Sequence, residues 1–171
     1  ASLLTHNVTL TALSLSHNNF GAGGFAELVA GLEQNTSICS LMLQHNRLGN
    51  RDCELLARAL QHNSSMTELS LASNRIGSDG CTALTLALQI SNRTLTSLDL
   101  QSNRISVFPM EWCLDNLVLQ HVNLRRNPTR TPAMHICHAD DDETAIAQLS
   151  SYMKDLRIGA QRPRHIKAVI V

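Results

Sequence analysis

Aromatic residues are scarce in this sequence, and neither sign of charge predominates. Phe, Tyr and Trp make up 3% of its 171 residues, which is poor for the flat surfaces that bind carbohydrate or stack on nucleic-acid bases. Fourteen Lys and Arg residues balance fourteen Asp and Glu residues, so no net field favours nucleic acid or an anionic membrane. We therefore expect no nucleic-acid, membrane or small-molecule partner and no cofactor.

Cysteine is present but forms no paired pattern. The five residues are Cys39, Cys53, Cys81, Cys113 and Cys137. Their odd number and the lack of a C-x-x-C pair argue against a disulfide framework and a zinc knuckle, so we expect a reducing compartment and a cytoplasmic protein. No apolar run approaches the roughly 18 residues of a membrane helix, which predicts a soluble chain. The sequence opens at Ala1 in the tail of a repeat unit, which favours an excised fragment.

One pattern of leucine and asparagine recurs five times. The segments follow L-x-x-L-x-L-x-x-N, with Ile, Met or Val allowed at the apolar places: LTALSLSHN from Leu10, ICSLMLQHN from Ile38, MTELSLASN from Met66, LTSLDLQSN from Leu95 and LQHVNLRRN from Leu119. The closing asparagines, separated by 28, 28, 29 and 24 residues, are Asn18, Asn46, Asn74, Asn103 and Asn127. Repeats of this period indicate a solenoid in which one unit stacks on the next.

Each of the first three asparagines is followed by a glycine-containing turn and a stretch with helical spacing of apolar residues. These are Phe25, Leu28 and Leu32; Cys53, Leu56 and Leu60; and Cys81, Leu84 and Leu88. Neither the strand nor the helix can bury its apolar face alone. We predict an α/β solenoid, a right-handed horseshoe fragment with a parallel sheet on the concave side and helices on the convex side. Because an asparagine amide both donates and accepts, the closing asparagines are predicted to form an interior ladder.

These motifs resemble the leucine-rich repeat family, and the units of 28 and 29 residues resemble its ribonuclease-inhibitor-like subtype. The resemblance covers about residues 1–127, whose first residues are the tail of an earlier repeat. It implies a non-catalytic scaffold for protein interaction. The fourth unit departs from it, because residues 105–116 are short and carry Phe108-Pro109 where a helix would begin. We expect a 3₁₀ turn and a change of curvature there.

The end of the chain follows a different pattern. Residues 128–158 predict a C-terminal cap with a helix over about 142–157, whose apolar stripe is Ile146, Leu149, Met153 and Leu156. Residues 159–171 predict a linker and a lone strand, HIKAVIV. This tail resembles the junction of Roco-type proteins, where repeats and a capping helix lead into the first strand of a Ras-like GTPase domain. The resemblance implies the repeat region of a larger GTPase regulator. No G-x-x-x-x-G-K-[ST] motif is present, so no nucleotide site is assigned.

Several motifs could indicate glycosylation, metal binding or reactive thiols, but each has a structural explanation. Four N-x-[ST] sequons recur with the repeat period, so we interpret them as helix-ending residues rather than glycosylation sites: Asn7, Asn35, Asn63 and Asn92. His135, Cys137 and His138 form one crowded group without the two separated ligand pairs of a structural zinc site, so no metal is expected. Cys53 and Cys81 share a register with Phe25, which predicts buried, unreactive thiols. No nucleophile motif occurs, and no catalytic residue is predicted.

The strand residues that alternate with the core leucines are predicted to face the concave side. The candidate partner-binding residues are Met42, Gln44, His45, Glu68, Ser70, Asp99, Gln101, His121, Asn123, Arg125 and Arg126. Glu68 and Asp99 precede a basic end at Arg125 and Arg126, which suits a protein partner or an adjacent domain of the same chain. Two other functions stay open. One is a free-standing regulator of a separate GTPase, as in Ran GTPase-activating proteins, and the other is the ligand-sensing repeats of an innate-immunity receptor.

Overall fold

The computed structural model describes residues 2–20, 23–109 and 118–129, in which helices and strands alternate along the chain. The helices are α1 (Ser2–His6), α2 (Gly24–Gln34), α3 (Asn50–His62) and α4 (Ser78–Ile90). The strands are β1 (Ala12–Ser14), β2 (Ser40–Met42), β3 (Glu68–Ser70), β4 (Ser97–Asp99) and β5 (His121–Asn123). Each strand is three residues long, and the paired residues are those at the centre of each repeat motif.

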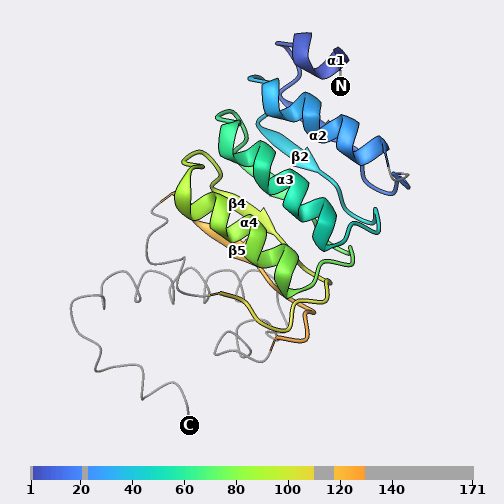
Figure 1. The fold of residues 1–171 in the computed structure, drawn as a ribbon, viewed down its shortest axis with the longest axis vertical. Helices are drawn as coiled ribbons and strands as arrows, with labels where there is room; N and C mark the ends of the chain where they lie inside the picture. Colours follow the sequence, from blue (N-terminus) through green and yellow to red (C-terminus); the bar gives the residue numbers. More distant parts are fainter. Residues whose placement is uncertain (1, 21–22, 110–117, 130–171) are drawn as a thin grey trace, which may run out of the picture.

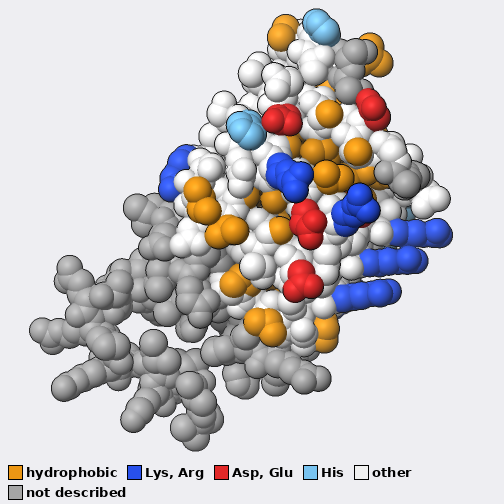
Figure 2. All heavy atoms as spheres, in the orientation of Figure 1, with side chains coloured by type: hydrophobic (Ala, Val, Ile, Leu, Met, Phe, Trp, Pro, Cys, Tyr) orange, Lys and Arg blue, Asp and Glu red, His pale blue; other side chains and the backbone are white. Residues whose placement is uncertain are grey.

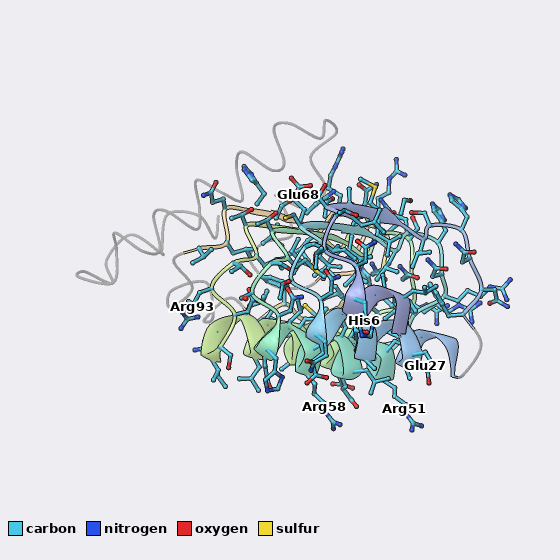
Figure 3. The ribbon with its side chains drawn as sticks, turned by 90° about the horizontal axis from the view of Figure 1, so that it is seen from above. His6, Glu27, Arg51, Arg58, Glu68 and Arg93 are labelled. Carbon is cyan, nitrogen blue, oxygen red and sulfur yellow. The ribbon has the colours of Figure 1, made fainter. Side chains whose placement is uncertain are left out.

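The five strands form one parallel sheet in the order β1-β2-β3-β4-β5. The central apolar residue of each motif pairs with its counterpart, from Leu13 through Leu41, Leu69 and Leu98 to Val122. Figure 1 shows the helices stacked side by side in sequence order, and the view from above in Figure 3 separates the sheet from the helix layer. The predicted α/β solenoid with a parallel sheet is confirmed.

The core lies between the sheet and the helices and consists mainly of leucine. Leu71 behind the sheet is fully buried, as are the helix residues that face it. Phe25, Cys53 and Cys81 occupy the same helix register and are all buried, so the core accepts side chains of different size at this position. Burial of this continuous apolar surface is what holds the repeats together.

The turns into the helices connect neighbouring repeats. The backbone N–H of Gly49 donates to Asp52 Oδ2 (2.8 Å), which satisfies a free donor at the start of α3. The backbone N–H of Gly77 instead donates to Asn50 Oδ1 of the preceding repeat (2.7 Å). The start of α4 is therefore tied to the start of α3.

Several predicted features lie wholly or partly outside the described residues. In the fourth unit, residues 105–109 form neither helix nor strand, and Phe108 is buried in the core. The rest of that unit, with the expected 3₁₀ turn, lies outside the described residues. The expected helix over 142–157, the linker and the strand HIKAVIV also lie outside the described residues.

Candidate functional site

In the second to fifth repeats, the asparagine that closes the strand segment joins neighbouring repeats through hydrogen bonds. Asn74 Nδ2 donates to the backbone oxygens of Leu43 in the preceding repeat (3.0 Å) and Leu71 in its own (3.0 Å). Asn74 Oδ1 accepts from the backbone N–H groups of Asn46 (2.9 Å) and Leu48 (3.0 Å). Backbone groups at the strand ends are thereby satisfied without water.

The first member of this ladder differs from the others. The four buried members are Asn46, Asn74, Asn103 and Asn127. Asn18 is exposed, and its Nδ2 donates only within its own turn, to the oxygens of Leu15 (2.9 Å) and Ser16 (3.2 Å). The interior position predicted for Asn18 is wrong in this structure, because β1 is the outermost strand of the described sheet and nothing described covers its outer side.

The residue before each ladder asparagine adopts a left-handed backbone conformation. Its φ lies between 54° and 59° at five equivalent positions: His17, His45, Ser73, Ser102 and Arg126. L-residues rarely adopt this conformation, so the surrounding ladder bonds must hold the turn in place. The exposed rings of His17 and His45 stack with centroids 4.2 Å apart and 14° between their planes. Two repeats thus present a preformed pair of imidazoles at the end of the sheet.

The strand register decides which side chains of the concave face are neighbours. One row across the sheet consists of Ser14, Met42, Ser70, Asp99 and Asn123. Ser70 Oγ donates to Asp99 Oδ2 (3.0 Å), and Asn123 Nδ2 donates to Gln101 Oε1 (3.0 Å). Asp99 Oδ1 also accepts from the backbone N–H of Gln101 (3.0 Å). The side chains of Ser70, Asp99 and Asn123 are therefore held with Gln101 in one hydrogen-bonded network over β3, β4 and β5.

The other side of the same face is less polar. Met42 is 43% exposed and lies in its row between two serines, Ser14 and Ser70. Beyond it, Ser16 Oγ donates to Gln44 Oε1 (2.5 Å). A thioether surrounded by small polar side chains can adapt to differently shaped partners.

The predicted partner-binding residues all fall on described residues, and all reach solvent. The exposed ones are Met42, His45, Glu68, His121 and Arg126, and the half-buried ones are Gln44, Ser70, Asp99, Gln101, Asn123 and Arg125. The structure brings Ser70, Asp99, Gln101 and Asn123 together in the network described above. Met42 and Glu68 lie on the same face without joining that network. Whether this set binds a partner stays a prediction.

Three asparagines of the sequons, Asn35, Asn63 and Asn92, form a second ladder at the helix ends, which the sequence pattern did not predict. Asn63 Nδ2 donates to the backbone oxygens of Leu32 (2.8 Å) and Asn35 (2.9 Å) in the preceding repeat. Asn63 Oδ1 accepts from the N–H groups of Ser65 (3.1 Å) and Met66 (2.9 Å) in its own. Each such amide therefore donates to backbone carbonyls at the end of the preceding repeat's helix. Its oxygen accepts from N–H groups in the turn that leads into the next strand of its own repeat.

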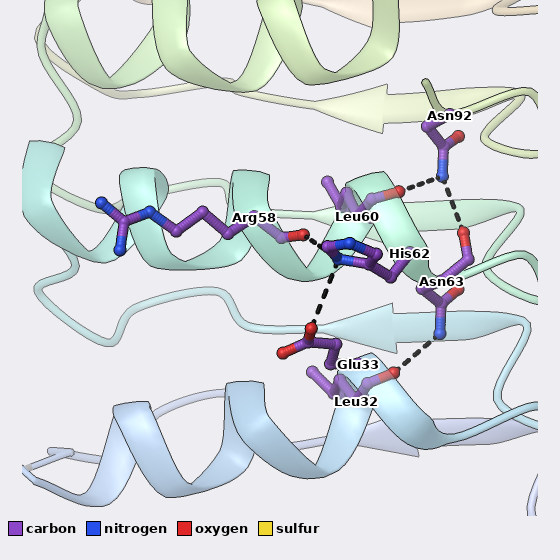
Figure 4. Close-up of polar contacts among 7 residues, drawn as sticks. All are labelled: Leu32, Glu33, Arg58, Leu60, His62, Asn63 and Asn92. Atoms are coloured by element: carbon purple, nitrogen blue, oxygen red, sulfur yellow. Dashed lines mark hydrogen bonds and ion pairs between the residues drawn. The ribbon is translucent and has the colours of Figure 1, made fainter. Parts of the chain in front are cut away.

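Asn35 and Asn92 repeat this arrangement, and all three amides are buried. An amide that is buried and fully bonded cannot accept a glycan in the folded protein, so the structural interpretation of these sequons fits the geometry. Figure 4 shows Asn63 and Asn92 on successive helix ends, with His62 Nδ1 3.3 Å from Glu33 Oε1 and 3.2 Å from the backbone oxygen of Arg58. The signal in the sequence was the repeat period of the sequons.

The cysteines of the described residues are free thiols. Cys53 and Cys81 are buried, whereas Cys39 is half-buried. Burial raises the pKa of the Cys53 thiol far above its ordinary value, with smaller contributions from Cys81, Asp52 and Glu54. Because only the thiolate is a good nucleophile, Cys53 is not a reactive group in the folded protein.

Comparisons with known proteins agree with this architecture. A family model described as "Leucine Rich repeat" matches residues 6–29, 62–84 and 91–107. The fold is a leucine-rich-repeat solenoid. No curated protein matches the sequence significantly. Within the described residues no helix has the length and apolarity to cross a membrane, and no three His, Cys, Asp or Glu side chains of that part are grouped to hold a metal ion.

Two solved structures share the leucine-rich-repeat fold over nearly the whole chain. One is entitled "Leiomodin-1 Actin-Binding Site 2 (ABS2)"; it is 18% identical, has a TM-score of 0.67, and the match covers 98% of this chain and 94% of that one. The other is the tropomodulin C-terminal domain from Caenorhabditis elegans; it is 13% identical, has a TM-score of 0.67, and the match covers 97% and 95%. At these identities the similarity concerns the fold.

Proposed function

We propose that this chain is a non-catalytic scaffold whose concave sheet face binds a partner protein. The observation that carries the proposal is the hydrogen-bonded network of Ser70, Asp99, Gln101 and Asn123 beside the exposed Met42. Side chains that are already held in place lose little conformational entropy when a partner binds, so a polar face of this kind can still give useful affinity.

A photo-crosslinking experiment tests this surface. The crosslinking residue p-benzoylphenylalanine replaces Met42 on the concave face or, as a matched control, Leu86 on α4, because these apolar side chains are similarly exposed at 43% and 49%. In cells that express the protein, we expect irradiation to give one discrete crosslinked protein from position 42 and none from position 86. The readout is mass spectrometry of the crosslinked band, repeated with Asp99→Ala, which should weaken that band.

Three outcomes of this experiment are informative. A discrete protein from position 86 alone would move the binding surface to the helices and overturn the concave-face proposal. Equal, diffuse labelling from both positions would also overturn it. Actin in the band from position 42 would favour a second candidate function, actin binding, for which the support is the fold similarity to an actin-binding site of leiomodin-1 over 98% of this chain.

We further propose that the scaffold is the ribonuclease-inhibitor-like repeat region of a cytoplasmic Roco-type GTPase regulator. The support is the order of patterns along the sequence. The repeats are followed by the pattern of a capping helix and then by the strand pattern HIKAVIV at residues 165–171. Sequencing the parent transcript beyond the codon for Val171 tests this context. We expect a G-x-x-x-x-G-K-[ST] motif directly after the strand, because a phosphate-binding loop follows the first strand of such GTPase domains. A stop codon at that point would rule the Roco context out and leave the scaffold proposal standing.

A further inference from the structure

An arginine directly follows the ladder asparagine in three consecutive repeats. The three residues, Arg47, Arg75 and Arg104, are all exposed. Figure 2 shows Lys and Arg side chains projecting in parallel from one edge of the molecule. We call these three residues the arginine row. Their shared signal in the sequence is the motif Asn-Arg followed by Leu or Ile.

The backbone holds the arginine row in register. The N–H of Arg75 donates to the oxygen of Leu48 (2.8 Å), and the N–H of Arg104 donates to the oxygen of Ile76 (2.8 Å). Arg104 also forms a parallel bridge with Gly77. Successive arginines therefore follow the spacing of neighbouring parallel strands, about 5 Å. Three positive charges lie in a line whose length and direction are set by the stacking of the repeats.

The positive charge of this row is not neutralised within the described residues. Within those residues the side chains of Arg47, Arg75 and Arg104 form no ion pair with an Asp or Glu side chain. The nearest acidic residues in sequence are Asp52 and Asp79, in the first turns of α3 and α4, and Asp99, whose carboxylate already accepts from Ser70 and Gln101 on the concave face. Asp52 already accepts the N–H of Gly49. Both helices begin three residues after an arginine of the row, so their partial positive charge adds to it.

We propose that the arginine row binds an extended acidic peptide segment of a partner protein. The planar guanidinium forks match carboxylates, and a strand rises about 3.3 Å per residue, so the row spans three to four residues of an extended peptide. Single-stranded nucleic acid fits less well, because it needs aromatic faces for its bases. The phenylalanines of the described residues are buried or packed edge to face, as Phe20 is against Phe25. This edge is distinct from the concave face, and the inference goes beyond the scaffold proposal.

Fluorescence anisotropy of a labelled octaglutamate peptide on the full 171-residue chain tests the proposal. We expect binding of octaglutamate and none of octaglutamine. The double variant Arg75→Gln/Arg104→Gln should weaken binding about tenfold, since exposed charge pairs each contribute a few-fold. The matched control is Arg51→Gln/Arg58→Gln, which removes the same charge from the convex side of α3, where Figure 3 shows both side chains pointing away from the sheet. We expect this control to change binding less than twofold.

Further variants distinguish the loss of charge from the loss of folding. They also distinguish binding at this edge from binding at the concave face. Arg75→Lys/Arg104→Lys keeps the charge but loses the planar fork, so binding should fall by less than in the Gln variant, while circular dichroism checks that each variant is folded. Met42→Ala should leave peptide binding unchanged, so failure here is distinguishable from failure of the scaffold proposal. No octaglutamate binding, or equal losses in the row and control variants, would overturn the inference. Tighter, row-dependent binding of oligothymidylate would overturn it in favour of nucleic acid.

Discussion

Replacing Asn74 by Ala should lower the free energy of unfolding by about 4 kcal/mol. The substitution removes the acceptor for two buried N–H groups, those of Asn46 and Leu48, and the donor for the oxygens of Leu43 and Leu71. Each buried polar group left without a partner costs about 1–3 kcal/mol, and the Ala side chain supplies neither a donor nor an acceptor for these four groups. Urea denaturation followed by circular dichroism measures the change.

The equivalent substitution at the outermost repeat is the matched control. Asn18→Ala removes bonds only to Leu15 and Ser16 at an exposed site, so we expect a loss below about 1 kcal/mol. If both variants lost the same amount, the bonds between repeats would contribute no more than the local turn does, and the interior ladder would not be a source of stability.

Gly80→Ala should destabilise the protein by about 2 kcal/mol, although Ala is favoured over Gly in a helix by about 1 kcal/mol. A Cβ atom at Gly80 would lie 2.9 Å from Asn50 Cα, 2.9 Å from Asn50 Oδ1 and 3.2 Å from Cys53 Cβ. The backbone of α3 would have to move, and the bond from Asn50 to the N–H of Gly77 would be strained with it. Thermal and urea unfolding both report this change.

Gly24→Ala in the first turn of α2 is the control for this prediction. Its Cβ would meet only Phe20 Cδ1, at 3.9 Å. Because there is no clash, the higher helix propensity of Ala decides the sign of the change in stability. We expect the free energy of unfolding to rise by up to about 1 kcal/mol. A gain at Gly80 as well would mean that α3 and α4 can separate at no cost, which would contradict the close packing seen between them.

The repeat architecture was predictable because each unit carries the same local signals. The leucines alternate along each strand, and the apolar residues of each helix recur every three to four positions, so both elements and their buried faces follow from neighbours in sequence. The burial of Phe25, Cys53 and Cys81 at one register was predicted for this reason. The exposed position of Asn18 was not, because its environment depends on what lies outside β1 and not on its own motif.

Other features depended on hydrogen bonds between residues of neighbouring repeats. The sequons were interpreted as helix ends, but the bonds from Asn63 to Leu32 and Asn35 cross from one repeat to another. The network from Ser70 to Asp99 spans 29 residues, and the contact between Asn123 and Gln101 spans 22. Such pairs have no local pattern, because they arise only when the sheet sets one strand beside the next.

By itself, the sequence determined the α/β solenoid, the faces of its strands and helices, and the residues available on the concave side. The physical reason is that side-chain direction within a strand or helix is set by local backbone geometry. Only the tertiary structure decided that Asn35, Asn63 and Asn92 form a ladder, that the rings of His17 and His45 stack, and that Arg47, Arg75 and Arg104 form a row. Those arrangements join residues one repeat apart, and the parallel pairing of neighbouring repeats brings them to within bonding or stacking distance.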